Sequence, residues 1–375
     1  MPRLSARTAN LYASPVREML KVAGRPDVIS FAGGLPAADS FDDLELPAPP
    51  RSLLQYGPTE GEPELRARVA EALRALGVRA DAEHVIILSG SQQGIDLAAK
   101  LTADPGAPIA LESPAYLAAL QVFRFFGAAL APFRRETPGA GWSAAPPRLA
   151  YVTPTFQNPT GACWSAAERL ALAEACDAEG VILFEDDPYR DLAYEPCERR
   201  PAVSFVERAS WIYQGSFSKS IAPGLRLGYL AASPDLFPLL VQLKQAADLH
   251  TNRLGQWMVL QHLNDPGRPA RLARVVDSYR AKRDAFDAAL RRRLGNAASW
   301  TRPPGGLFFW AELGEGVDVA ALHRRAAERG VLFTPGEHFL AEKGARCSAI
   351  RLNFSAADAP TADRGLAILA ELLDA

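Results

Sequence analysis

The feature of this chain that most limits its fold is an alternation of short apolar runs with helix-like segments, beginning near His84. Each apolar run has the length of a strand and leads, through a turn rich in small residues, into a stretch with helical periodicity. This alternation is typical of an α/β fold with a mostly parallel sheet and helices on both faces. The expected strands are residues 84–88, 107–112, 149–153, 181–186, 209–214 and 227–231.

Length and composition leave room for a second domain. The 375 residues are 48% hydrophobic, enough to bury a large core. A long polar-amphipathic helix is expected over residues 268–294, and we interpret it as the connection to a smaller α+β domain. We therefore predict a large domain over residues 36–274, and a small domain made of residues 1–35 and 275–375.

Several classes of function are disfavoured by composition. A formal net charge of -2 argues against a nucleic-acid or anionic-membrane partner. No apolar run is long enough to span a bilayer, and Met1–Asn10 lacks the apolar region of a signal peptide. Cys163, Cys176, Cys197 and Cys347 lie far apart, as ordinary thiols in a reducing cytoplasm do. The five histidines show no ligand spacing, so we expect no metal site.

The most informative segment is residues 214–229, where Lys219 lies among small and hydroxyl residues. An amine that forms a Schiff base needs an uncrowded approach and surroundings that keep part of it unprotonated. Ser216 and Arg226 add a hydroxyl and a fork of donors, a combination that holds phosphate. Taken alone, the segment fits a surface lysine in a polar loop equally well.

Turns after two of the expected strands carry candidate binding residues. Ser91 and Gln92 lie between a strand and a helix N-terminus, where free N–H groups and the helix dipole favour an anion. Many α/β turns have this form with nothing bound. Tyr116 follows the strand over residues 107–112, at the edge where such sheets bind ligands. It is placed either to stack on a planar ring or to pack as a core aromatic.

Two later strands also end in polar residues. Asn158 follows the strand over residues 149–153, in a Pro-Thr-Gly turn where asparagine is also a common turn former. The apolar strand over residues 181–186 ends in Glu185, Asp186 and Asp187, with Tyr189 beyond. A buried carboxylate here would keep the nitrogen of a pyridine ring protonated. Alone, the segment also fits a solvated acidic loop.

Together these motifs resemble one family. Residues 216–219 (Ser-Phe-Ser-Lys) and 222–228 (Ala-Pro-Gly-Leu-Arg-Leu-Gly) look like the lysine segment of fold-type I, pyridoxal-phosphate-dependent aminotransferases of class I/II. The chain is most similar to the branch of α-aminoadipate and kynurenine aminotransferases. The resemblance runs from residues 14–17 through 32–36 to 350–354. It departs at residues 131–148, which are shorter than in relatives and which we expect to form a surface loop.

The resemblance assigns cofactor roles to the matching positions. It implies that Lys219 binds pyridoxal 5'-phosphate as a Schiff base, that Tyr116 stacks on the ring, and that Tyr189 contacts the phenolic oxygen. The family's Asp-x-x-Tyr spacing selects Asp186, rather than Asp187, as the partner of the ring nitrogen. The residues matched to the cofactor phosphate are Ser91, Gln92, Ser216 and Arg226, with Tyr56 contributed by the neighbouring subunit.

The same resemblance implies a substrate site. Arg351 and Asn158 would hold the substrate carboxylate, and the backbone at Gly34 would lie beside the bound amino acid. Arg17, in an N-terminal segment that covers the substrate, would pair with a distal side-chain group. From the residues alone, Gly34 also fits a tight turn, Arg351 a surface strand and Arg17 an exposed helix.

We therefore expect a homodimeric, cytoplasmic aminotransferase with shared active sites and ping-pong kinetics. It would exchange an amino group between 2-aminoadipate, glutamate, or an aromatic or branched-chain L-amino acid and a 2-oxo acid, with 2-oxoglutarate as the expected acceptor. Lys219 would move the proton between the substrate Cα and the cofactor. A pyridoxal-phosphate-dependent lyase or decarboxylase uses the same frame and is the alternative. A regulator with an aminotransferase-like domain is a weaker one, because the chain shows no basic N-terminal module.

Overall fold

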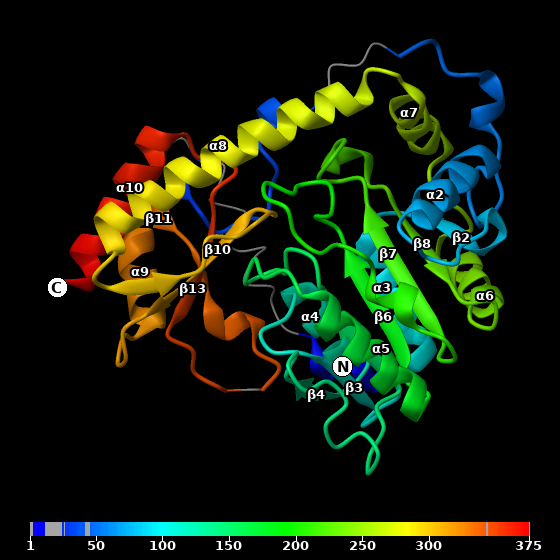
Figure 1. The fold of residues 1–375 in the computed structure, drawn as a ribbon, viewed down its shortest axis with the longest axis horizontal. Coiled ribbons are helices and arrows are strands. Elements are labelled where there is room, and N and C mark those ends of the chain that lie inside the picture. The colour runs from blue at the N-terminus through cyan, green and yellow to red at the C-terminus, as the bar shows by residue number, and fades with distance from the viewer. Residues whose placement is uncertain (1–2, 12–24, 26, 42–45, 343, 375) are drawn as a thin grey trace.

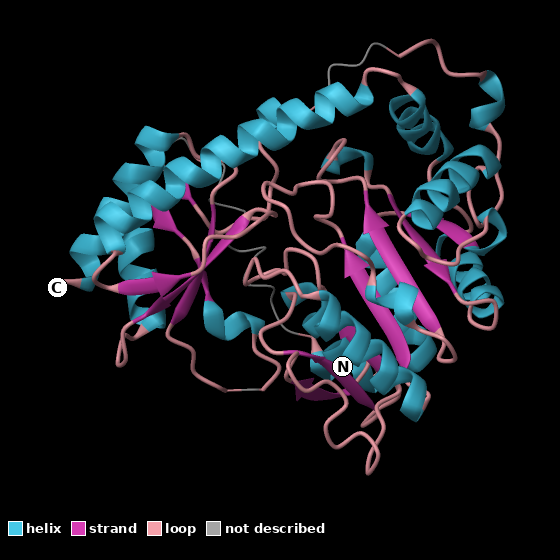
Figure 2. Ribbon diagram, in the orientation of Figure 1, coloured by secondary structure: helices cyan, strands magenta, loops and turns pink. Residues whose placement is uncertain are grey.

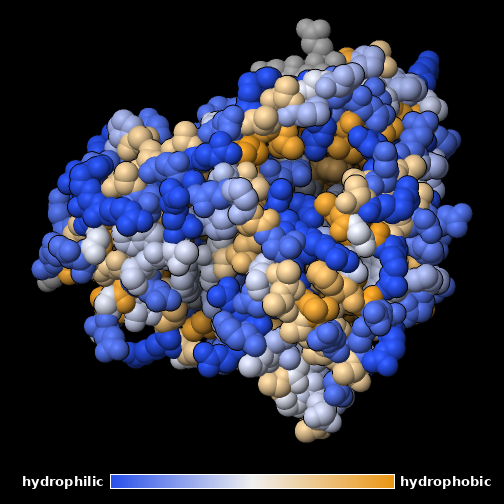
Figure 3. Space-filling view, in the orientation of Figure 1, coloured by the Kyte–Doolittle hydropathy of each residue, from blue (hydrophilic) through white to orange (hydrophobic). Residues whose placement is uncertain are grey.

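The computed structural model describes residues 3–11, 25, 27–41, 46–342 and 344–374. These residues form two lobes, and the long helix α8 (Arg268–Leu294) runs along one side of the molecule from the larger lobe to the smaller one (Figure 1). In Figure 3, polar residues cover most of the smaller lobe, and apolar patches show on the larger one. No helix among the described residues has the length and hydropathy to cross a bilayer.

The larger lobe is built on a sheet to which the described residues contribute seven strands (Figure 2). Neighbouring strands from β7 through β6, β5 and β3 to β4 are parallel, whereas β8 runs antiparallel to both β7 and β2. In spatial order the strands are β2 (Val85–Leu88), β8 (Gly228–Ala232), β7 (Trp211–Ser216), β6 (Ile182–Asp187), β5 (Leu149–Val152), β3 (Pro108–Glu112) and β4 (Ala129–Phe133).

Helices cover both faces of this sheet. Successive residues of a strand point to opposite faces, so these apolar strands present apolar side chains on both sides. Ile86 and Leu88 belong to one core cluster, whereas Val85 and Ile87 belong to another. The first cluster includes α3 (Ser91–Thr102), α4 (Leu117–Phe125) and α6 (Phe237–Asp248). The second includes α2 (Pro63–Ala75), α5 (Ala166–Glu179) and α7 (Arg253–Asn264).

Local sequence determines where these helices begin and end. In α5, the Ser165 hydroxyl accepts from the Glu168 backbone and the Glu168 carboxylate accepts from the Ser165 backbone, which forms a capping box. The same helix ends at Gly180, whose left-handed φ of 66° closes the last turn. The α2 helix begins at Pro63, a position where the missing N–H costs nothing.

The strand directions bring distant segments to one edge of the sheet. Because β8 is antiparallel to both of its neighbours, β2 runs in the same direction as β7, and thus as β6, β5 and β3. The carboxyl ends of these strands therefore lie along one edge, which is where open α/β sheets bind ligands. Most of the predicted cofactor-binding residues lie at or just beyond these ends.

The smaller lobe contains a four-stranded antiparallel sheet, in the order β12-β13-β10-β9 among the described residues. Its central strand β13 places Arg351 between Trp310 and Thr334. A separate pair joins β1 to β11, so the N-terminal segment lies along this lobe. The elements are β1 (Ile29–Ser30), β9 (Ala298–Trp300), β10 (Phe308–Leu313), α9 (Val319–Glu328), β11 (Val331–Leu332), β12 (Thr334–Pro335), β13 (Ala349–Asn353) and α10 (Ala359–Leu373).

The expected α/β architecture is confirmed, and one expectation needs correction. Residues 131–133 belong to β4, a parallel edge strand on β3, and not to the surface loop predicted over residues 131–148. The strand pairs with β3 through backbone hydrogen bonds, which the Ala/Pro-rich composition does not reveal. The predicted border between residues 274 and 275 falls within the continuous helix α8, so the division into domains stays a prediction.

Candidate active site

A cavity of about 270 Å³ lies at the carboxyl edge of the main sheet. Segments from six places in the sequence converge there. Its lining contains the predicted residues Ser91, Gln92, Tyr116, Asn158, Asp186, Tyr189, Ser216, Lys219 and Arg226, together with Thr153, Pro188 and Ser218.

Lys219 places its amine inside this cavity. Its Nζ donates a hydrogen bond of 2.9 Å to the carbonyl oxygen of Gly34, in the segment that follows β1. Burial lowers the pKa of the amine to about 8, and the positive charges of Arg226 and Arg351 act in the same direction. Near neutral pH a larger fraction of this lysine than of an exposed lysine is therefore an uncharged nucleophile.

Another part of the lining is suited to hold an anion. Ser91 begins α3, and Ser91, Gln92 and Arg226 line the same cavity, so the positive end of the helix and the guanidinium lie at one place. Arg226 has a left-handed φ of 53°, an uncommon conformation for this residue type. A Cβ at Gly90 would lie 2.6 Å from Arg226 Nη2, so glycine is required for the guanidinium to approach the turn.

A buried carboxylate lies at the floor of the cavity. Asp186 accepts from the Tyr151 hydroxyl at 2.7 Å and from Gln214 Nε2 at 2.9 Å. Burial raises the pKa of Asp186 to about 6, against the effect of these two hydrogen bonds. The adjacent Asp187 instead accepts from Tyr213 and Arg190, both at 2.8 Å, and does not line the cavity.

Arg351 lies beside the cavity, 3% exposed. It donates to Asn158 Oδ1 at 2.7 Å through Nη1 and to the Ala32 carbonyl oxygen at 2.5 Å through Nη2. Its Nε is buried and has no hydrogen-bond partner among the described residues. Burial lowers the pKa of the guanidinium to about 10, so it keeps its charge at neutral pH. A buried cation with an unused donor is suited to bind a carboxylate.

These surroundings fit pyridoxal 5'-phosphate. The anion cradle at Ser91, Ser216 and Arg226 suits its phosphate, and Asp186 suits its ring nitrogen. A protonated ring nitrogen beside Asp186 would favour the ionised carboxylate and reverse the effect of burial. The Lys219 amine lies within the same cavity, as the aldehyde requires.

The predicted roles of Tyr56 and Arg17 stay predictions. Tyr56 is 75% exposed and does not line the cavity. Its role requires a second copy of the chain, so this single chain does not test it. Arg17 lies outside the described residues.

The residues that hold Asp186 were not predicted from the sequence. Gln214 lies in the buried strand β7, and a Cβ at Gly94 would come within 1.8 Å of its Oε1, so α3 makes room for this side chain. Tyr151 occupies β5 and is also buried. A polar residue inside the otherwise apolar run of β7 was the available signal.

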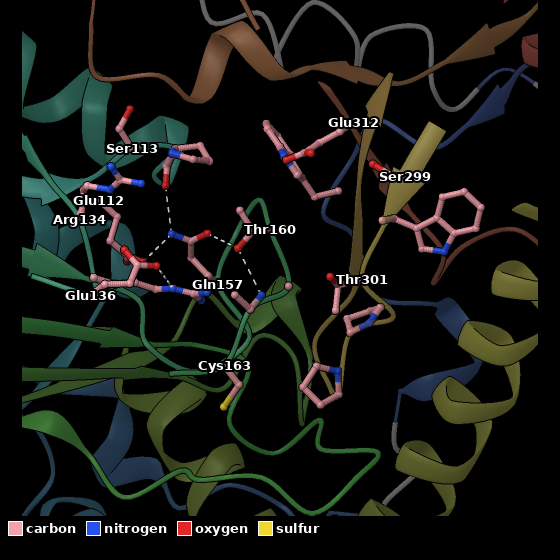
Figure 4. A pocket seen from close by; sticks show the side chains of 18 of the residues that line it. Glu112, Ser113, Arg134, Glu136, Gln157, Thr160, Cys163, Ser299, Thr301 and Glu312 are labelled. Carbon is pink, nitrogen blue, oxygen red and sulfur yellow. Dashed lines mark hydrogen bonds and ion pairs between the residues drawn. The ribbon is translucent and has the colours of Figure 1, made fainter. Parts of the chain in front are cut away.

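A second missed group connects the loops on which Tyr116 and Asn158 lie. Glu112, at the end of β3, accepts from Gln157 Nε2 at 2.7 Å, Trp164 Nε1 at 3.1 Å and the Thr153 backbone at 3.0 Å. Gln157 also donates to the Pro114 carbonyl oxygen at 3.0 Å. Figure 4 shows Gln157 between Glu112 and Thr160 at the wall of a larger cavity. Burial raises the pKa of Glu112 to about 7.

Comparison with known proteins agrees with this geometry. The profile of the family described as aminotransferase class I and II matches residues 48–369. A 2-aminoadipate transaminase of Thermus thermophilus is 40% identical over 366 residues, which cover 93% of this chain and 90% of the relative. An aromatic-amino-acid aminotransferase of Thermococcus litoralis is 33% identical, covering 98% and 93%.

A solved structure extends the likeness to three dimensions. An α-aminoadipate aminotransferase of Thermus thermophilus superposes with a TM-score of 0.86 at 35% identity, covering 99% of this chain and 97% of that one. That protein was crystallised with N-(5'-phosphopyridoxyl)-L-leucine, a derivative of the cofactor. The fold-type I architecture expected from the sequence is thereby confirmed.

The lowered pKa of Lys219 predicts how the apo-protein takes up pyridoxal phosphate. Because only the neutral amine attacks the aldehyde, the rate of uptake should rise with pH and level off just above pH 8. The measurement is the initial rate of visible-absorbance change across a pH series. A rate that keeps rising toward about pH 10.4, as for a free lysine side chain, would contradict the desolvated amine.

The hydrogen bonds of Glu112 predict that Glu112→Gln weakens cofactor binding. The new amide cannot accept from all three donors, and an unsatisfied buried donor costs about 1–3 kcal/mol. We expect a lower melting temperature and a Kd for pyridoxal phosphate raised by about tenfold, equivalent to ~1.4 kcal/mol. Glu312→Gln, an exposed position that lines the same cavity, is the matched control. An unchanged Kd with only a lower melting temperature would leave Glu112 a purely structural residue.

Proposed function

The chain belongs to the class I and II aminotransferases, and we propose that it transfers the amino group of an L-amino acid to 2-oxoglutarate with ping-pong kinetics. The proposed donors are 2-aminoadipate, glutamate, and aromatic or branched-chain amino acids. The observation that carries this proposal is the buried guanidinium of Arg351, whose Nε is unpartnered among the described residues and which lies beside Asn158.

Arg351 and Asn158 hold the substrate in this proposal. The carboxylate binds the guanidinium, and Asn158 keeps that guanidinium oriented through the 2.7 Å hydrogen bond to its Nη1. Phe308 and Phe339 pack against the same guanidinium, with 4.3 and 4.9 Å between Arg351 Cζ and the ring centroids. These rings restrict the side chain and exclude water, which strengthens its attraction for a carboxylate.

Lys219 and Asp186 perform the proton chemistry. Pyridoxal phosphate, when bound, supplies a ring that accepts the electron pair left by the departing Cα proton. Lys219 Nζ, with a pKa of about 8, takes that proton as a base and returns it as an acid. Asp186, held by Tyr151 and Gln214, keeps the ring nitrogen protonated.

The identity of the donor is proposed from relatives. The two similar proteins described above act, by their names, on 2-aminoadipate and on aromatic amino acids. 2-Aminoadipate and the aromatic amino acids all have extended side chains, and that of 2-aminoadipate is acidic. We propose that Arg17 pairs with the distal carboxylate of acidic donors, as the sequence resemblance implies.

We further propose that two copies of the chain share their active sites. Tyr56 is exposed, and so are Leu54, Leu249 and Leu254, a group of apolar side chains that a second copy would cover. Arg253 Nη1 donates to the carbonyl oxygens of Gln55 at 3.0 Å and Tyr56 at 3.3 Å, so the tyrosine segment is held against the start of α7. A partner's Tyr56 would then complete the phosphate cradle. The proposed compartment is the cytoplasm, where unpaired cysteines are the rule.

A panel of amino donors with 2-oxoglutarate tests the proposed function, with glutamate formation as the readout for donors other than glutamate itself. For Arg351→Gln we expect kcat/KM to fall about 10- to 100-fold for every donor, since a hydrogen bond to a charged group contributes roughly 1.5–3 kcal/mol. The Kd for pyridoxal phosphate should change little. Arg17→Ala should lower kcat/KM for acidic donors only.

Arg329→Gln is the matched control, because this arginine is half exposed at the end of α9 in the same lobe. It should leave every kcat/KM unchanged. Release of ammonia without any 2-oxo acid would instead favour a lyase. An Arg351→Gln enzyme with unaltered kcat/KM would contradict the assignment of Arg351 as the carboxylate site. An equal loss of kcat/KM on acidic and neutral donors in Arg17→Ala would contradict the role of Arg17.

A further inference from the structure

The fold brings together two cysteines that are far apart in the sequence. Cys163 follows the loop that carries Asn158, and Cys197 lies in the segment beyond β6. The Cys163 thiol donates to the carbonyl oxygen of Glu198, the neighbour of Cys197, at 3.0 Å. Because Glu198 directly follows Cys197, this contact brings the Cys163 sulfur next to the segment that carries Cys197. Both side chains pack at the margin of the same core cluster.

A buried arginine lies next to this pair. Arg169 Nη2 is 3.7 Å from the Cys163 sulfur and 3.2 Å from the Glu198 carbonyl oxygen. Its guanidinium is fully buried, and it also faces the Glu185 carboxylate at 3.5 Å, which neutralises part of its charge. A guanidinium beside a thiol stabilises the thiolate and holds the local backbone in place.

The two thiols differ in pKa. The neighbouring Cys197 thiol, and then the Arg169 guanidinium, lower the pKa of Cys163 to about 7. The Cys163 side chain in turn raises the pKa of Cys197. Near neutral pH, Cys163 has the larger fraction of nucleophilic thiolate, and Cys197 is a protonated thiol beside it.

Cys163 is also accessible. It lines a cavity of about 820 Å³ whose walls come from the larger lobe and from β9 and β10 of the smaller lobe (Figure 4). The other two thiols lack this combination of exposure and a lowered pKa. Cys176 is fully buried, and Cys347, although half-buried, has a raised pKa because of its burial.

We propose that Cys163 and Cys197 form a reversible peroxide-sensitive pair, in which Cys163 is oxidised first and Cys197 resolves it to a disulfide. The Cys163 thiolate attacks one oxygen of hydrogen peroxide, an S–O bond forms, the O–O bond breaks, and the other oxygen leaves as water after taking a proton. Cys197 sulfur then attacks Cys163 sulfur, and the S–S bond forms as the S–O bond breaks, releasing a second water. Two thiols are oxidised and one peroxide is reduced.

Cys163 is connected through Arg169 to the loop that carries Asn158. Arg169 contacts the Cys163 sulfur and also donates to the Pro154 carbonyl oxygen at 2.8 Å, at the base of the loop that carries Asn158. Oxidation of the pair thus acts on the segment next to the substrate-binding asparagine. The pair itself does not depend on the proposed reaction, so its test is separate from the donor panel.

The test treats the holoenzyme with equimolar hydrogen peroxide at pH 7 and maps its peptides by mass spectrometry. We expect a peptide pair linked through Cys163 and Cys197, lighter by two hydrogen atoms and restored by dithiothreitol. Before oxidation, an alkylating reagent should modify Cys163 at least about tenfold faster than Cys347, because thiolate is the reacting form.

Variants separate the two thiols. In Cys197→Ser, a sulfenic-acid probe such as dimedone should label Cys163, whereas Cys163→Ser should give neither label nor link. Cys347→Ser is the matched control and should form the link as the unaltered protein does. A link through Cys347, or a Cys163 that stays reduced under peroxide, would overturn the proposal. Peptide mapping of the unaltered protein decides this even if a variant fails to fold.

Discussion

The site depends on one amine being held out of water. Lys219 is largely buried at the edge of the main sheet, hydrogen-bonded to Gly34 and near the positive charges of Arg226 and Arg351. An exposed lysine in the same loop would be protonated and inert. The rest of the structure serves to keep this amine desolvated and to place its reaction partners around it. Arg226 and Arg351 each have two effects, because each lowers the pKa of Lys219 and each is suited to bind an anion.

The topology explains how such a site can be assembled. Because β2, β3, β5, β6 and β7 all end at one edge, short loops suffice to bring an anion cradle, a carboxylate and an amine together. The second lobe closes the site from the other side through Arg351 on β13 and through the segment after β1. Polar contacts behind the cavity, at Gln214 and Glu112, then fix the orientation of groups that the strands place only approximately.

The sequence predicted the parts of this arrangement that local patterns report. Apolar alternation predicted the parallel sheet, and the family resemblance of the Lys219 segment and the other motifs predicted the cofactor. The choice of Asp186 over Asp187 came from motif spacing, and the structure places Asp186 in the cavity. The edge strand β4 was not predicted from the sequence, because its pairing with β3, rather than its composition, defines it. Periodicity in a single sequence does not report tertiary contacts between segments that are distant in sequence. The contacts of Gln214 and Glu112, and the proximity of Cys163 to the segment of Cys197, are of this kind.

The central claim is that Lys219 Nζ carries the aldehyde of pyridoxal phosphate. Borohydride reduction of the holoenzyme would make this linkage permanent, and peptide mass spectrometry would then locate it. Our account predicts a phosphopyridoxyl group on Lys219 alone, and no trapped group in Lys219→Arg. A trapped group on Lys244, a lysine whose side chain is fully buried beside Asp248, or an enzyme that gives no adduct at all, would contradict it.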